Sequence, residues 1–108
     1  MRKISKATMK VLEEDERMKK CCLAYLGDCK GKIEWHHNLI YAGKQSDVPE
    51  TILGICKKHH EQANDKVMKE RLDYQMLKLF NPRQFEMFPK SSLYMRRYYL
   101  IKKYGNSG

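Results

Sequence analysis

The stretch that decides the fold runs from position 21 to position 64 and reads CCLAYLGDCKGKIEWHHNLIYAGKQSDVPETILGICKKHHEQAN. Every cysteine and every histidine of the 108-residue chain lies between positions 21 and 60. They are Cys21, Cys22, Cys29, His36, His37, Cys56, His59 and His60. Thiol and imidazole side chains are the ligands that zinc and related metals take in proteins. The clustering therefore predicts a metal site, and the number of ligands favours two.

The composition is typical of one folded domain, with 42% hydrophobic and 32% charged residues. No apolar run approaches the ~18–20 residues of a membrane helix, and a signal-peptide pattern is lacking. We therefore expect the protein to lie in a reducing cytoplasm. In that compartment four cysteines indicate zinc binding or catalysis rather than disulfides. The 22 Lys and Arg against 13 Asp and Glu give a formal charge of +9. This excess favours DNA as a partner, with RNA also open, because neutralising phosphates releases counterions.

Residue patterns in the first part of the chain predict a helix, two strands and a second helix. The expected elements are a helix over residues 6–20 capped by Ser5, strands over 32–41 and 51–55 around a loop of residues 42–50, and a helix from Lys57. The first helix is expected to bury Ala7, Val11, Leu12 and Met18. On the second helix, His60 and Asn64 are four residues apart and would share a face.

The C-terminal part is expected to be helical and basic. The expected elements are a helix over residues 67–80 that buries Met68, Leu72, Met76, Leu79 and Phe80, and a last helix over residues 92–104 that begins at Ser91 or Ser92 and ends at Gly105. Residues 81–108 contain six Lys and Arg against one Glu. The candidate nucleic-acid contacts are Lys44, Arg96, Arg97, Lys102 and Lys103. Tyrosines at helical spacing in the same segment favour packing over base stacking.

The spacing of the ligands divides them into two sets. Zinc takes about four ligands in a tetrahedron, usually as two close pairs. Cys56 and His59 form one pair, and Cys29 with Cys21 or Cys22 forms the other. The ligands left over are His36, His37, His60 and Asn64. A structural zinc would not need them, so this surplus is the main sign of a second metal site.

The arrangement resembles the HNH (ββα-metal) endonucleases, in particular small bacteriophage-type members grouped with recombination enhancement nucleases. The matching stretches are the cysteine pair at 21–22, Glu34-Trp35-His36-His37, the loop with Gly43-Lys44-Gln45, and residues 52–60. The similarity covers about residues 20–65. It implies an α+β fold: a small zinc-stabilised ββα-metal core over residues 21–65, flanked by the N-terminal helix of residues 1–20 and a basic helical extension of residues 66–108, in one domain.

The resemblance also implies roles for individual residues. His37 would be the general base, and His36 and His60, with Asn64 as a further ligand, would hold a catalytic divalent ion: Mg²⁺, Mn²⁺, Ni²⁺ or Zn²⁺. Cys21, Cys29, Cys56 and His59 would hold a structural Zn²⁺, Cys21 being favoured over Cys22 by the placement of Leu23 and Gly27 in related phage proteins. The implied activity is hydrolysis of DNA phosphodiester bonds in a bacterial host cytoplasm, with a recombination protein as a partner.

One position departs from the family pattern. The asparagine that usually orients the loop carrying the base, five residues before the last cysteine, is Thr51 here. Thr51 keeps a hydroxyl that can orient the loop by another hydrogen bond. The substitution and the basic, tyrosine-rich tail favour an alternative, a non-catalytic zinc-stabilised module that binds nucleic acid or a protein.

Overall fold

The computed structural model describes residues 5–41, 43–46, 48–88 and 92–105, without the side chains of Tyr41 and Lys44. Its helices are α1 (Lys6–Glu13), α2 (Lys57–Glu61), α3 (Lys66–Lys78), α4 (Pro82–Glu86) and α5 (Leu93–Tyr104). The strands are β1 (Ile33–His37), β2 (Ile40–Tyr41), β3 (Lys44–Gln45) and β4 (Ile52–Cys56), and the 3-10 helices are η1 (Glu16–Lys19), η2 (Ala24–Leu26) and η3 (Pro49–Thr51). The chain is therefore a small α+β protein, as predicted.

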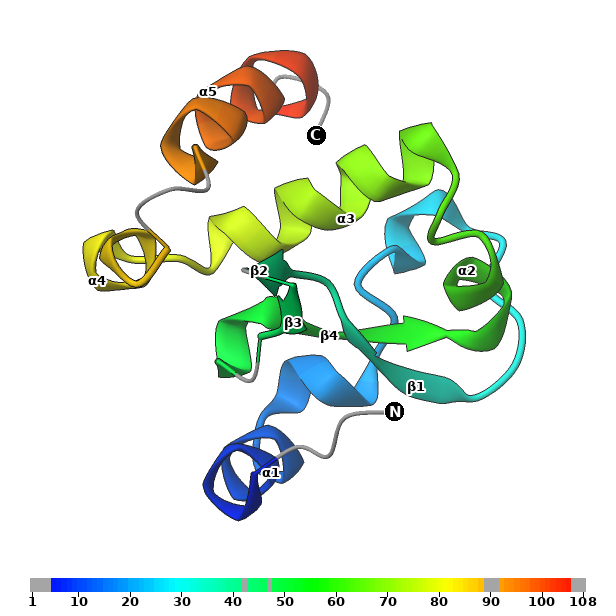
Figure 1. Ribbon diagram of the computed structural model, residues 1–108. Helices are drawn as coiled ribbons and strands as arrows, with labels where there is room; N and C mark the ends of the chain where they lie inside the picture. The colour runs from blue at the N-terminus through cyan, green and yellow to red at the C-terminus, as the bar shows by residue number, and fades with distance from the viewer. Residues whose placement is uncertain (1–4, 42, 47, 89–91, 106–108) are drawn as a thin grey trace.

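The centre of the fold is the antiparallel pair of β1 and β4. Ile33 pairs with Cys56 at one end and His37 with Ile52 at the other. Helix α2 follows β4 directly and contacts both strands, while α3 lies between the strands and α5 (Figure 1). The strand β4 is buried throughout, because η1 and α3 both pack against it. This arrangement brings the segments rich in cysteine and histidine to the two ends of one strand pair.

The core is apolar and continuous from the cysteines to the C-terminal helix. It joins Leu23, Ile55, Leu72, Met76 and Leu100 in one cluster. A smaller cluster of Leu12, Met18 and Ile52, against which Trp35 packs, lies under the N-terminal segment. Within the described residues, no helix combines the length and the apolar character that crossing a membrane requires.

The predicted helix over residues 6–20 is wrong in its second half. Ser5 caps α1 as expected, its hydroxyl accepting the Thr8 N–H at 3.2 Å. The helix ends at Glu13, because the Asp15 carboxylate accepts the Arg17 N–H and begins η1 instead. Arg17 then donates to the carbonyls of Pro49 and Ile52 at 2.6 and 2.7 Å. These long-range bonds require the chain to turn, and they leave Ala7 and Val11 exposed.

The predicted strand over 32–41 and the loop after it also differ. The ladder with β4 runs to His37, and the Asn38 N–H still donates to the Thr51 carbonyl at 2.9 Å in the same register. The chain then turns into the short β2–β3 hairpin, so the expected loop of residues 42–50 contains β3 and the start of η3. Tertiary contacts thus divide one β-rich segment into two strands.

The C-terminal helices occur near their expected positions, with corrections at their ends. Leu79 is 38% exposed, because α3 ends at Lys78 and Leu79 is its C-cap. Ser92 precedes α5 but makes no capping hydrogen bond, since its φ of 58° places it in the left-handed region. Ser91 lies outside the described residues. The short α4 is fixed by a capping box between Asn81 and Gln84.

Candidate functional site

Three cysteines and one histidine from four separate places in the chain converge at one end of the strand pair. Cys21 precedes η2, Cys29 precedes β1, Cys56 ends β4 and His59 lies in α2. Their ligand atoms all lie within 4.8 Å of one another. The His59 Nδ1 atom is 3.4, 3.7 and 3.2 Å from the Sγ atoms of Cys21, Cys29 and Cys56. The predicted set Cys21, Cys29, Cys56 and His59 is therefore one cluster.

The geometry of this Cys3His cluster can hold a metal ion and is compatible with zinc. With Zn–S of about 2.3 Å and Zn–N of about 2.0–2.1 Å, a tetrahedral site has sulfur-to-nitrogen edges of about 3.6 Å. The three observed edges lie around that value. Cys56 also accepts the His59 N–H at 3.5 Å, so the end of the strand and the first helical turn hold both ligands locally. Closed Cys3His sets are typical of structural zinc.

Cys22 is excluded from the cluster, which decides between the two adjacent cysteines. Its backbone N–H donates to Gly54 at 2.8 Å and its half-buried side chain packs against the hydrophobic core. Burial, with the neighbouring Cys21, raises the pKa of Cys22 to about 12, so this thiol stays protonated. The choice between Cys21 and Cys22 depends on which backbone N–H group pairs with β4, which sequence spacing alone does not determine.

Asp28 completes the surroundings of the cluster, and the sequence analysis missed it. Its Oδ1 atom lies 2.7 Å from His59 Nε2, and its Oδ2 atom accepts from Lys58 Nζ at 2.8 Å. With Nδ1 facing the three sulfurs, Nε2 carries the proton and donates to Asp28. The hydrogen bond from Lys58, then that from His59, lowers the pKa of Asp28 to about 2. The available signal was a carboxylate directly before Cys29.

Of the histidines outside the cluster, His36 of β1 and His60 of α2 are in contact. The rings of His36 and His60 meet edge to face, with centroids 5.0 Å apart. The His60 Nδ1 atom is 2.8 Å from a carboxylate oxygen of Glu34, so this contact uses Nδ1 and not Nε2. Burial, then the neighbouring His60, lowers the pKa of His36 to about 4. His36 is therefore neutral near pH 7, which is the form that binds metals.

An open cleft of about 520 Å³ lies beside this pair, between β1 and α3. Its lining includes His36, His37, Asn64, Lys69, Asp73 and Arg96. Asn64 reaches the cleft from a turn, because α2 ends at Glu61, so the predicted helical face shared with His60 is wrong. Within the described residues, only the Cys3His cluster brings three or more Cys, His, Asp or Glu ligand atoms together. His36 and His60 thus form a pair without a third protein ligand of these types.

Thr51 supports the loop that leads to the cleft. Its buried hydroxyl donates to the Val48 carbonyl at 2.6 Å and lies 3.0 Å from Ser46 Oγ. Its own carbonyl accepts the N–H of Asn38, the residue after His37. The hydroxyl therefore fixes the turn before β4, and the carbonyl fixes the end of β1.

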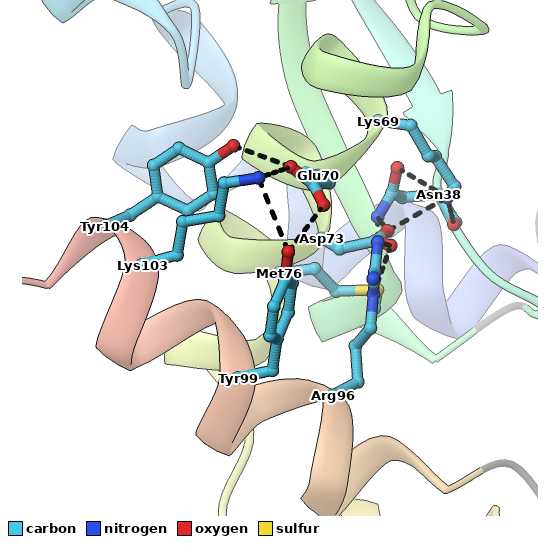
Figure 2. Close-up of polar contacts among 9 residues, drawn as sticks. All are labelled: Asn38, Lys69, Glu70, Asp73, Met76, Arg96, Tyr99, Lys103 and Tyr104. Atoms are coloured by element: carbon cyan, nitrogen blue, oxygen red, sulfur yellow. Dashed lines mark hydrogen bonds and ion pairs between the residues drawn. The ribbon is translucent and has the colours of Figure 1, made fainter.

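A buried carboxylate on α3 ties this strand end to α5. The Asn38 side chain donates to Asp73 at 2.9 Å, and Lys69 lies 2.9 Å from the same carboxylate (Figure 2). Arg96 of α5 donates to the other oxygen of Asp73 through Nε and Nη2, at 3.2 and 3.0 Å. Lys69 also donates to the carbonyl of Asn38. Asp73 therefore holds two cations at the wall of the cleft.

The remaining predicted nucleic-acid contacts are mostly engaged in the fold. Lys103 donates to Glu70 at 2.7 Å, Lys102 lies over the ring of Tyr98, and Arg97 lies over the ring of Phe85. The side chain of Lys44 lies outside the described residues. On α5, carboxylates therefore neutralise Arg96 and Lys103, whereas the ring contacts of Arg97 and Lys102 leave their charge in place.

Comparisons with known proteins assign neither a family nor a function to the chain. No protein-family model, no curated protein and no solved structure matches the chain. The function must be argued from the site itself.

Proposed function

We propose that the protein is a metal-dependent nuclease that hydrolyses phosphodiester bonds of DNA, with a structural zinc in the Cys3His cluster. The observation that carries the proposal is the contact between His36 and His60, whose ring centroids lie 5.0 Å apart. Neither residue belongs to the Cys3His cluster. Neither histidine is needed for a four-ligand zinc, and both have the ligand chemistry of a second metal. The resemblance of residues 20–65 to HNH endonucleases points to the same activity.

The donor set suits a divalent ion that is held by few protein ligands better than one that protein side chains enclose completely. Imidazole nitrogen suits Ni²⁺ or Zn²⁺ better than Mg²⁺, which prefers oxygen ligands, and waters with a substrate phosphate would complete the coordination of the ion. His36 and His60 offer two imidazoles, and Asn64 lines the same cleft as His36. Glu34, 2.8 Å from His60 Nδ1, orients the ring, and Nε2 would be the atom left to bind an ion. When bound, the ion would stabilise charge on the phosphate and on the departing oxygen.

The residues of the chain would divide the remaining work. His37 would accept a proton from the attacking water, because imidazole is the side chain that most readily exchanges protons near neutral pH. Its position at the end of β1 is maintained by the bond from the Asn38 N–H to Thr51. Arg96, which uses Nε and Nη2 for Asp73, has other N–H groups for a substrate phosphate in the cleft. The Cys3His cluster would hold the strand pair and α2 in register.

One observation favours the alternative of a zinc-stabilised binding module without catalysis. Within the described residues, the His36–His60 pair lacks a third Cys, His, Asp or Glu ligand, so its affinity for a metal would be low. The two functions differ in a simple measurement. A nuclease consumes supercoiled plasmid, whereas a binding module only retards its migration.

The first prediction is that purified protein nicks supercoiled plasmid when Mg²⁺, Mn²⁺ or Ni²⁺ is added. His37→Ala should lower the rate roughly 10²–10⁴-fold, the usual contribution of a positioned acid–base group. The melting temperature and zinc content of His37→Ala should equal those of the wild type, because His37 does not belong to the Cys3His cluster.

The matched control is Gln62→Ala, an exposed change at the end of α2, which should cleave like the wild type. Cleavage that survives His37→Ala would contradict the assigned base. The absence of cleavage with every ion, together with DNA binding and one tightly bound zinc, would establish the binding module instead.

A further inference from the structure

A second cleft, of about 550 Å³, lies between α3, the end of α5 and η2. Its lining includes Tyr25, Arg71, Tyr74, Lys78, Lys103 and Tyr104. On α3 the residues of the two clefts are distinct: Lys69, Asp73 and Met76 face the first, and Arg71, Tyr74, Gln75 and Lys78 face the second. At ~100° per residue, the centres of these two sets lie about 180° apart around the helix. The second cleft is therefore separated from the candidate catalytic cleft by α3.

The second cleft has the charge of an anion site. Among the described residues, its lining contains three cations and no Asp or Glu. Lys103 is neutralised by Glu70 at 2.7 Å, but within the described residues neither Arg71 nor Lys78 has a carboxylate partner. In the first cleft, by contrast, Lys69 and Arg96 both pair with Asp73. Arg71 and Lys78 therefore give the second cleft two cations that no carboxylate among the described residues neutralises, and neither was among the nucleic-acid contacts predicted from the sequence.

Tyrosines give the same cleft a surface for planar groups. Tyr25 is 62% exposed. The rings of Tyr74 and Tyr104 lie 5.9 Å apart, and Lys78 Nζ lies 5.1 Å from the centre of the Tyr74 ring. Aromatic rings beside cations are the recurring surface on which unpaired bases stack while phosphates meet Lys and Arg. A duplex hides its base faces and could not use them.

The wall formed by α5 is preorganised by one buried carboxylate. Glu70, only 7% exposed in its side chain, accepts from Lys103 Nζ and from Tyr104 Oη at 2.7 and 2.8 Å (Figure 2). Tyr99 Oη donates to its other oxygen at 3.4 Å. These bonds fix Tyr104 before any ligand arrives, which lowers the entropy cost of binding.

We propose that the second cleft binds single-stranded nucleic acid, with Arg71 and Lys78 on phosphates and Tyr25 stacked on a base. The combination of cations that lack carboxylate partners among the described residues with the exposed ring of Tyr25 favours this ligand over an acidic protein, which would need only the cations. The binding goes beyond the proposed hydrolysis and does not require a second metal, so it can be measured apart from cleavage.

The test is fluorescence anisotropy of a labelled oligothymidylate of about 12 nucleotides, with the full chain and no added divalent ion. Arg71→Gln combined with Lys78→Gln should weaken binding roughly tenfold or more and reduce the salt slope by about 1.4, the value for two phosphate contacts on a single strand. Tyr25→Ala should weaken binding roughly tenfold, and Tyr25→Phe should bind like the wild type, because stacking needs the ring alone.

The matched control combines Lys6→Gln with Lys10→Gln, which removes the same charge from exposed positions on α1. An equal loss in this control would overturn the proposal in favour of diffuse attraction to a basic protein. Tyr25→Ala that binds like the wild type, or polyglutamate that competes as well as the oligothymidylate, would overturn it in favour of an acidic partner. His37→Ala should retain oligothymidylate binding while losing plasmid nicking, so the two proposals fail separately.

Discussion

At the scale of single residues, Asp28 shows how a ligand's neighbour controls a metal site. The carboxylate accepts the Nε2 proton of His59, so that Nδ1 is unprotonated toward the three sulfurs. Lys58 holds the second carboxylate oxygen in place. Partners of this kind orient the ligating ring and raise its basicity. Asp28 is therefore a positioning residue for the Cys3His cluster.

We predict that Asp28→Asn weakens zinc binding about 10- to 100-fold, the usual effect of losing such a partner. The asparagine can still accept one hydrogen bond but carries no charge to stabilise the ring. Competition with a chromophoric chelator measures the affinity directly. Glu16→Gln, an equally small change at an exposed site in η1, is the control and should bind zinc like the wild type. Equal affinity in both variants would refute the role of Asp28.

At the scale of elements, α5 is attached to α3 by two carboxylates. Asp73 binds Arg96 near the start of α5, and Glu70 binds Lys103 and Tyr104 near its end (Figure 2). Leu93 and Leu100 add the apolar part of the contact. The polar bonds therefore set the position of α5 along α3, while the apolar side chains supply burial.

We predict that the attachment of α5 weakens in acid through Glu70. The hydrogen bond from Lys103, then that from Tyr104, lowers the pKa of Glu70 to about 2, below the ~4.3 of an unfolded glutamate. A carboxyl group whose pKa is lower in the folded state than in the unfolded chain stabilises the folded state at every pH above the unfolded pKa. This stability is lost as the pH falls from about 4.3 toward 2.

Melting temperatures measured across that pH range test the role of Glu70. Glu70→Gln should melt several degrees lower at pH 7 and show a flatter decline in acid, because the glutamine does not titrate. Glu61→Gln, an exposed change on α2, should follow the wild-type curve. A Glu70→Gln curve parallel to the wild type would show that other carboxylates cause the acid loss.

At the scale of the whole molecule, the Cys3His cluster and the hydrophobic core are one structure. Cys21 and Cys56 pack in the same cluster as Leu72 and Leu100, which belong to α3 and α5. Structural zinc in small domains supplies roughly 10–16 kcal/mol of apparent binding free energy. The net stability of a whole domain is only ~5–15 kcal/mol. Loss of the ion should therefore affect every element, including those far from the cysteines.

We predict that a strong chelator unfolds the chain in one transition. Far-ultraviolet circular dichroism, which reports α3 and α5, and the fluorescence of Trp35 should be lost together. Cys29→Ala and Cys56→Ala should have the same effect without a chelator. Cys22→Ala is the matched control and should stay folded, because Cys22 is not part of the Cys3His cluster. Retention of the helical signal after Trp35 has changed would show two independent units.

The sequence by itself determined the α+β class, the approximate helices and the membership of the Cys3His cluster. The reason is that Cys56 and His59 meet through local geometry, a strand end followed by one helical turn, and periodic apolar residues specify helices. The placement of His36 beside His60 was likewise predicted, from the resemblance of the surrounding residues.

Only the tertiary structure decided which residues are engaged and which are free. Arg96 and Lys103, chosen from their charge, are paired with carboxylates on α3, whereas Arg71 and Lys78 line a cleft and have no carboxylate partner in the part of the chain that the structure describes. Asp28 reaches His59 across 31 positions of sequence. Contacts of this range depend on how α3, α5 and the strand pair pack together, and no local pattern of residues encodes that packing.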